Sequence, residues 1–250
     1  MLRHFRIRNA LFLTALVLVG LVAVQAVAQD TRGVRFTADE ERGQDPTSKI
    51  EGENLIAAEP KNPDAYIRYA RFLQSTGDLV GAEEVLQTGR KKANRSARLL
   101  VALGTVQEDR RQLAKAEATA REALAVDSEY VPAHLLMGHL RFRLGMPQQG
   151  LRSYRTAHEL APTEPEPQVR LVEGMMDNGM VSEAEDQCLM FLSENGTNTD
   201  LWLALGKVFE EQEKLREAFT TYGQVMTLDP ENDEASARQG RLFCRFGQYE

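Results

Sequence analysis

Residues 199–232 read TDLWLALGKVFEEQEKLREAFTTYGQVMTLDPEN, and this stretch contains the pattern that decides the fold. Large apolar residues recur at helical spacing: Trp202, Leu205, Phe209 and Tyr222. Small residues, Gly206 and Ala218, stand where two helices would meet. The stretch therefore predicts a pair of amphipathic helices whose apolar faces pack closely together.

The same pattern recurs with a period of 34 residues. The blocks begin at Pro63, Ala97, Val131, Pro165, Thr199 and Asp233. The eighth position of each block is small in five of the six: Ala70, Gly104, Gly138, Val172, Gly206 and Gly240. A fixed period of this length indicates stacked supersecondary units, each unable to bury its apolar face alone. We expect an all-α solenoid of antiparallel helix pairs, with five full repeats and a partial sixth.

The blocks resemble the tetratricopeptide repeat family, and the fifth is most similar, with Trp202-x-x-Leu205-Gly206-x-x-Phe209, Ala218, Tyr222 and Pro230. The resemblance covers residues 63–250 and implies a right-handed α-α superhelix. In the family, the first helix of each pair lines a concave groove, and the second forms the outer surface.

Within the first block we expect helices over residues 64–76 and 80–92. Glycines at the turn between the helices predict a left-handed residue at the end of the first helix: Gly77, Gly145, Gly179 and Gly247. Arg111 and Glu213 occupy the same position without that freedom.

The fourth and sixth blocks depart from the pattern. Val172 and Phe191 add bulk where helices should meet, which predicts either a local bend that presents a site or a compensated core. The sixth block stops at Glu250, at the start of its second helix. The natural chain continues, a partner covers the last helix, or that helix is itself a cap.

The N-terminus predicts an exported protein. Residues 1–28 hold three arginines, then an apolar run of 15 residues from Ala10 to Val24, then Ala26-Val27-Ala28. This is the layout of a signal peptide cleaved after Ala28. The alternative is an uncleaved membrane anchor, although the run is shorter than the roughly 20 residues that span a bilayer. We predict a periplasmic location, a flexible leader over residues 29–46, and a capping helix within residues 47–62.

Charge and cysteine content exclude some partners. The full chain has a formal net charge of -7, and removal of the signal leaves -10, which disfavours nucleic acid as a partner. Cys188 and Cys244 lie in blocks four and six, and repeat units contact only their neighbours, so a disulfide between them is not expected. Cys188 occupies a core position and is expected to be buried.

Catalytic and metal-binding constellations were not found in the sequence. No phosphate-binding loop, zinc-protease motif or Cys-x-x-Cys pair occurs. His134 and His139 are about 140° apart on one predicted helix and do not pair as ligands. His134 is expected in the core, and His139 in the groove. We expect a protein that is not an enzyme, with no cofactor and no metal, unless a catalytic domain follows Glu250.

The fifth position of the blocks predicts an apolar stripe along the groove: Ile67, Val101, Leu135, Val169, Leu203 and Ala237. If exposed, it suits a peptide with spaced apolar anchors. The alternative is that it is partly buried between adjacent helices. The candidate partner-binding residues are Ile67, Arg71, Val101, Leu135, His139, Phe142, Val169, Glu173, Met176, Leu203 and Lys207. Position five is apolar, so the clamp with which some family members hold a chaperone tail is absent.

Charge differs along the repeats. Blocks one to three sum to +3, whereas blocks four and five sum to -10. This asymmetry predicts a ligand with a basic portion, unless the acids are merely solvated. We therefore expect a scaffold that binds a protein or peptide segment, with a role in envelope assembly. The alternatives are self-association through the C-terminal helix, and a regulatory part of a longer protein.

Overall fold

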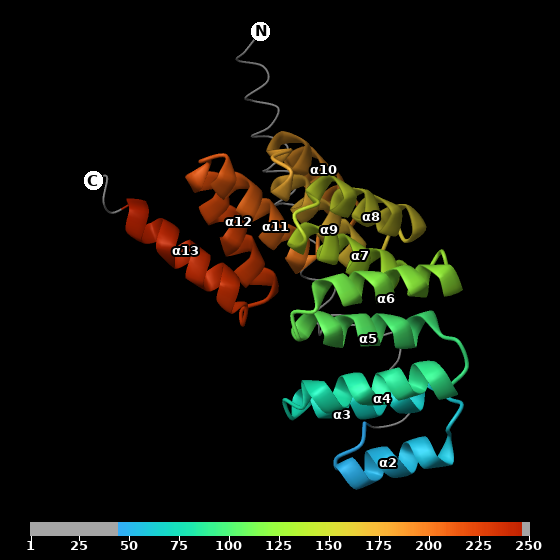
Figure 1. Ribbon diagram of the computed structural model, residues 1–250. Helices are drawn as coiled ribbons and strands as arrows, with labels where there is room; N and C mark the ends of the chain where they lie inside the picture. The colour runs from blue at the N-terminus through green and yellow to red at the C-terminus, as the bar shows by residue number, and fades with distance from the viewer. Residues whose placement is uncertain (1–44, 247–250) are drawn as a thin grey trace. The chain divides into compact units, whose positions relative to one another are not determined.

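The computed structural model describes residues 45–246, and its described residues are helical with short turns. They fall into two compact units, residues 45–162 (the N-terminal unit) and residues 163–246 (the C-terminal unit). The signal peptide, nearly all of the leader and Gly247 lie outside the described residues. Figure 1 labels the twelve helices of this region. Their bounds are α2 Lys49–Ala58, α3 Pro63–Ser75, α4 Leu79–Lys92, α5 Ala97–Asp109, α6 Leu113–Val126, α7 Val131–Arg143, α8 Pro147–Leu160, α9 Pro165–Asp177, α10 Val181–Glu194, α11 Thr199–Glu211, α12 Leu215–Leu228 and α13 Asp233–Phe246.

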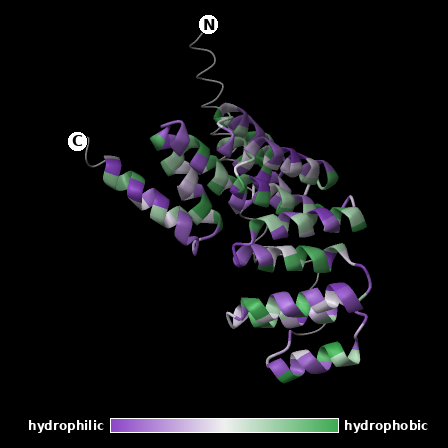
Figure 2. Cartoon of the chain, viewed as in Figure 1, coloured by the Kyte–Doolittle hydropathy of each residue, from purple (hydrophilic) through white to green (hydrophobic). Residues whose placement is uncertain are grey.

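The helices form the expected pairs within each unit. In the N-terminal unit α3 packs on α4, α5 on α6 and α7 on α8. In the C-terminal unit α9 packs on α10 and α11 on α12, and α13 packs on α12. Figure 2 shows hydrophobic and hydrophilic residues alternating along the helices, as expected for helices that bury one face. The all-α fold of stacked helix pairs is therefore confirmed.

The turn inside each pair has the same geometry whether or not it contains glycine. Gly77, Gly145 and Gly179 have φ angles of 82°, 75° and 74°. Arg111 and Glu213 have φ angles of 60° and 57°, in the same left-handed region. A side chain there costs about 1–2 kcal/mol relative to glycine. The packing of the paired helices therefore imposes this conformation on residues that do not favour it.

Position eight brings the helices of a pair close together. A Cβ on Gly138 would lie 2.4 Å from Cε1 of Tyr154, and one on Gly206 would lie 2.3 Å from Cε1 of Tyr222. Both tyrosines belong to the second helix of the same pair. The predicted need for a small residue is thus confirmed in α7 and α11.

In three of the first helices, the side chain at position four forms a hydrogen bond with the turn that precedes the helix. The Tyr66 hydroxyl donates to the carbonyl of Pro60 at 3.0 Å, and the Trp202 indole N–H donates to that of Gly196 at 2.8 Å. Nε2 of His134 lies 2.8 Å from the carbonyl of Ser128. In each case the ring reaches a carbonyl six residues earlier. His134 is half-buried in this contact, so it is a packed histidine, although less deeply buried than its predicted core position implied.

The N-terminal unit begins with α2, which packs on α3. Ser48 caps this helix by accepting a hydrogen bond from the Glu51 backbone N–H at 3.2 Å. Gly52 faces the ring of Tyr69, and a Cβ there would lie 2.1 Å from Cδ2. The helix therefore covers the aromatic side chains of α3 at close range.

The N-terminal unit also contains a buried carboxylate. Glu83 of α4 is 3% exposed and forms an ion pair with Arg110. Nε2 of Gln87 donates to Glu83 at 2.9 Å, and Nε2 of the buried Gln107 donates to the same carboxylate at 3.4 Å. Hydrogen bonds and a cation thus compensate the burial of this charge.

The bulky residues of block four are part of the core of the C-terminal unit. Val172 is fully buried and Phe191 is 1% exposed. Cys188 is also fully buried, as expected, and its Sγ lies 3.2 Å from the carbonyl of Leu201. Burial raises the pKa of the Cys188 thiol to about 12. These contacts favour the compensated core over a bend that presents a site.

Candidate partner-binding surface

The first helices of the pairs form a surface in each unit, which we call the first-helix surface. In the N-terminal unit it consists of α3, α5 and α7, and in the C-terminal unit of α9, α11 and α13. Successive first helices touch, with α3 against α5, α5 against α7, and α9 against α11. This is the surface on which the predicted groove residues lie.

The fifth position does not form a continuous exposed stripe. Ile67, Leu135 and Leu203 are only 5%, 9% and 8% exposed, because adjacent first helices pack against one another there. Val101 and Val169 are half-buried, and Ala237 is exposed. The alternative, that position five is buried between adjacent helices, thus holds for the three largest side chains.

Exposed polar residues occupy position nine of the N-terminal unit: Arg71, Thr105 and His139. Arg71 forms an ion pair with Asp45 at 3.3 Å. Nε2 of His139 lies 2.7 Å from Glu108, and the Arg143 guanidinium is also 2.7 Å from that carboxylate. Burial raises the pKa of Glu108, but the hydrogen bonds from His139 and Arg143 outweigh it and hold the pKa below its ordinary value. This part of the surface is polar, and most of its charged side chains form ion pairs.

Phe142 does not widen the predicted groove. Its ring stacks on Tyr154 of α8, with ring centroids 5.4 Å apart. A Cβ on Gly150 of α8 would lie 2.5 Å from the Phe142 ring. The half-buried phenylalanine therefore packs toward the second helix of its own pair, and the expectation that it extends an apolar stripe is wrong.

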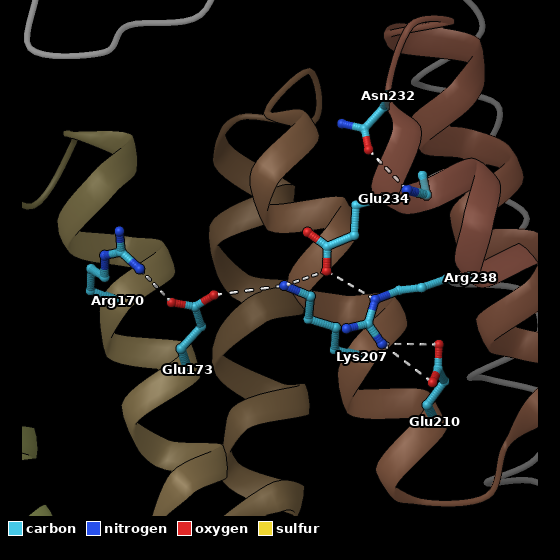
Figure 3. Close-up of polar contacts among 8 residues, drawn as sticks. Arg170, Glu173, Lys207, Glu210, Asn232, Glu234 and Arg238 are labelled. Atoms are coloured by element: carbon cyan, nitrogen blue, oxygen red, sulfur yellow. Dashed lines mark hydrogen bonds and ion pairs between the residues drawn. The ribbon is translucent and has the colours of Figure 1, made fainter. Parts of the chain in front are cut away.

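The C-terminal unit has a row of alternating charges across α9, α11 and α13, shown in Figure 3. Glu173 pairs with Arg170 at 3.0 Å and with Lys207 at 3.9 Å. Lys207 pairs with Glu234 at 3.1 Å, and Arg238 continues the row to Glu234 and Glu210 at 3.0 and 3.4 Å. We call these six residues the charge row. The sequence predicted that acidic side chains of this unit bind a basic ligand. Those of the charge row are already partly neutralised by Arg170, Lys207 and Arg238.

The two arginines of the charge row were missed as site residues. Arg170 and Arg238 stand at position six of blocks four and six, and Arg68 stands at the same position of block one. Position six was not among those expected to face the groove. The recurrence of arginine there was the signal available in the sequence.

Two other carboxylates on α9, Glu166 and Asp177, are not members of the charge row. Burial raises the pKa of Glu166, and the attraction of Arg170 at 3.9 Å does not offset it, while nearby Asp200 adds to the rise. Burial and Glu173 likewise raise the pKa of Asp177. Both carboxylates therefore lie where an additional positive charge would be stabilising.

Half-buried apolar side chains share that face of α9. Val169 follows Glu166 by three residues and Met176 follows Glu173 by three, a spacing that makes side chains neighbours on a helix surface. The α9 face, defined as Glu166, Val169, Glu173, Met176 and Asp177, thus combines acidic groups with apolar contact area. It contains three of the eleven predicted residues.

Three features of the described residues bear on metal binding, membrane crossing and nucleophilic chemistry. Between residues 45 and 246, no group of three or more His, Cys, Asp or Glu side chains is arranged to hold a metal ion. In the same range, no helix is both long and apolar enough to cross a membrane. The high pKa of the Cys188 thiol keeps it protonated, so it is a poor nucleophile.

The geometry defines a helical-repeat protein, and comparison with known proteins shows which repeats it resembles. A model described as tetratricopeptide repeat matches residues 52–104, and a second with the same description matches residues 199–232. The two matched stretches are therefore similar to tetratricopeptide repeats, and proteins with such repeats generally mediate protein–protein interactions. Neither match is to an enzyme family. Among curated protein sequences, none matches this chain.

Several solved structures share the fold. TTC0263, a protein from Thermus thermophilus, is 15% identical with a TM-score of 0.62, covering 73% of this chain and 100% of its own. A tetratricopeptide repeat protein from Parabacteroides merdae is 21% identical with a TM-score of 0.60, covering 78% and 73%. YrrB, described as having an unusual peptide-binding site, is 18% identical with a TM-score of 0.53, covering 76% and 97%.

Proposed function

We propose that this chain is a non-catalytic scaffold that binds a peptide or protein segment on the α9 face. The segment would present a basic residue to Glu166 or Asp177 and an apolar side chain to Val169 or Met176. The raised pKa values of the two carboxylates are the observation that carries this proposal, because they indicate that neighbouring cations, including Arg170 at 3.9 Å from Glu166, do not offset the burial of these charges beside apolar area. YrrB, of similar fold, is described as a peptide-binding protein.

The buried side chains at position five do not supply the binding energy at this site. Leu135 and Leu203 are buried, so replacing them with aspartate would unfold the repeats rather than test a binding surface. Arg71, Thr105 and His139 lie in the N-terminal unit and are not part of the proposed site, which belongs to the C-terminal unit alone.

A charge-reversal experiment tests the α9 face. Random peptides are selected on the purified chain, and the enriched peptides are expected to contain lysine or arginine near spaced apolar residues. Glu166→Lys with Asp177→Lys should weaken their binding at least about tenfold and remove its salt dependence. The matched control, Glu183→Lys with Asp186→Lys on exposed positions of α10, makes the same change in net charge. Equal losses in both variants, or peptides without basic residues, would contradict the proposal.

We also propose that the scaffold works in the cell envelope. The layout of residues 1–28 supports export, and N-terminal sequencing of the protein from the envelope fraction should begin at Gln29. A start at Met1 in a membrane fraction would favour the anchor instead.

A second candidate function is self-association through the C-terminal helix. A face of α13 that no residue between 45 and 246 covers favours it.

A further inference from the structure

The last helix, α13, occupies the same positions of the repeat as α11, yet one of its faces is covered by no described residue. In α11, Gly206 lies beneath Tyr222 of the second helix, and Phe209 is 1% exposed. In α13, a Cβ on Gly240 would meet nothing within 4 Å, and Phe243 is 68% exposed. The face that receives a partner helix in α11 is therefore open in α13.

The opposite side of α13 is firmly packed, so the open face has a defined direction. Ala235 and Leu242 are 0% and 2% exposed, and Gln239 donates a hydrogen bond from Nε2 to the carbonyl of Phe219 in α12 at 3.1 Å. Figure 1 shows α13 lying against α12. The open face consists of five exposed residues: Ser236, Ala237, Gly240, Phe243 and Cys244.

The two ends of α13 carry opposite charges beside this face. Glu234 lies in the first turn, and Arg241 and Arg245 lie in the second half. Neither arginine forms an ion pair with any residue between 45 and 246. In α11 the residue equivalent to Arg245 is Glu211, which would repel an acidic first turn. Of these two helices, α13 thus carries charges that complement its own reversed sequence, and α11 does not.

We propose that the open face of α13 binds α13 of a second copy of this chain, antiparallel, around a twofold axis at Gly240. The two glycines let the helices approach closely at the crossing point. Phe243 of each copy then packs on Ser236 and Ala237 of the other, and Arg245 of each lies beside Glu234 of the other. Every contact occurs twice, as in any isologous interface. A single helix pair is a small interface, so a weak dimer is expected. This proposal is independent of peptide binding on the α9 face.

Cross-linking tests the geometry. In a Cys244→Ser background, Gly240→Cys should form a disulfide-linked dimer on mild oxidation, because residues at a twofold axis face their own copies within disulfide reach. Thr220→Cys in the same background is the control, since Thr220 is exposed on α12. Cross-linking of both variants to the same extent, or of neither, would overturn the proposed pairing.

Light scattering over a concentration series into the millimolar range tests the contacts. The mass of the unmodified chain should rise to that of a dimer and no further. Phe243→Asp and Arg245→Glu should both remain monomeric, and Glu234→Arg combined with Arg245→Glu should restore the dimer. Far-ultraviolet circular dichroism checks that each variant is folded.

The remaining outcomes overturn the proposal. A chain that stays monomeric throughout leaves the face to a helix following residue 246 or to a different protein. Growth beyond a dimer indicates head-to-tail stacking. A dimer that persists in Phe243→Asp lies on another surface.

Discussion

The two units use equivalent repeat positions for different electrostatic contacts. In the N-terminal unit the carboxylates form small separate clusters, and one of them, Glu83, is 3% exposed. In the C-terminal unit six partly exposed side chains join in the charge row across three helices. Since both backbones follow the same 34-residue pattern, the repeat geometry does not dictate these charges. The units are therefore free to differ in what they recognise while sharing one architecture.

The largest expected difference between the units concerns removal of one ion-pair partner. Arg110→Ala would leave Glu83 buried without its cation, which should reduce the free energy of unfolding by about 3–5 kcal/mol. The comparison variant, Lys214→Ala, removes the 2.7 Å contact to Glu185, where the lysine is 41% exposed, and should cost at most about 1 kcal/mol. Urea unfolding of both variants measures the difference. Similar losses would show that burial does not distinguish these two pairs.

A methyl group added at position eight should have opposite effects in α7 of the N-terminal unit and α13 of the C-terminal unit. Gly138→Ala in the N-terminal unit places a Cβ against Tyr154 and should destabilise the protein by about 1–3 kcal/mol. Gly240→Ala in the C-terminal unit meets open space and should stabilise α13 by about 0.5–1 kcal/mol through helix propensity. Thermal unfolding in dilute solution gives both signs. A loss of stability in Gly240→Ala would mean that this face is covered.

Removing the charge of Glu108 probes the paired carboxylates of the N-terminal unit. Glu108→Gln weakens the hydrogen bonds from His139 and Arg143 and should cost about 1–2 kcal/mol at neutral pH. The folded-state pKa is lowered, so this stabilisation is present above the ordinary value of 4.5 and is lost as the pH falls through the folded-state pKa. Urea titrations at neutral and acidic pH should show that the cost disappears in acid. A cost that persists in acid would assign it to packing.

The smallest effect, with the opposite sign, is expected on the α9 face. The folded-state pKa of Glu166 is raised, so its protonated form contributes stability below pH 4.5 that is lost as the pH rises through the folded-state pKa. Glu166→Gln should therefore stabilise the protein at neutral pH, by no more than a few tenths of a kcal/mol because the side chain is 40% exposed. Glu183→Gln on α10 is the control. Destabilisation by Glu166→Gln would show that its ion pair with Arg170 dominates.

The sequence was sufficient to predict the helix pairs, their boundaries to within one or two residues in the first block, and the close contact at position eight. These features depend on local periodicity and on residue size, which the sequence states directly. The left-handed φ of Arg111 and Glu213 was not predicted, because these residues disfavour it and only the packing of the helix pair imposes it.

The exposure of the candidate site could not be predicted in the same way. Whether Leu135 is buried depends on how closely α5, α7 and their neighbours pack, and apolar character alone fits either outcome. The charge row also escaped prediction, because Arg170 and Arg238 reach carboxylates whose positions depend on the packing of the helices. Such contacts depend on distances between side chains of different repeats, and these distances cannot be inferred from the residue types.

The contact between Trp202 and the turn before α11 has a practical consequence for spectroscopy. Trp202 is the sole tryptophan of the sequence, and it lies in the C-terminal unit with its indole N–H bonded to Gly196. Its fluorescence is therefore a native optical probe of that unit, whereas circular dichroism reports helices of both. Two unfolding curves that coincide would show that the array melts as one cooperative body, and curves that separate would give each unit a melting temperature of its own.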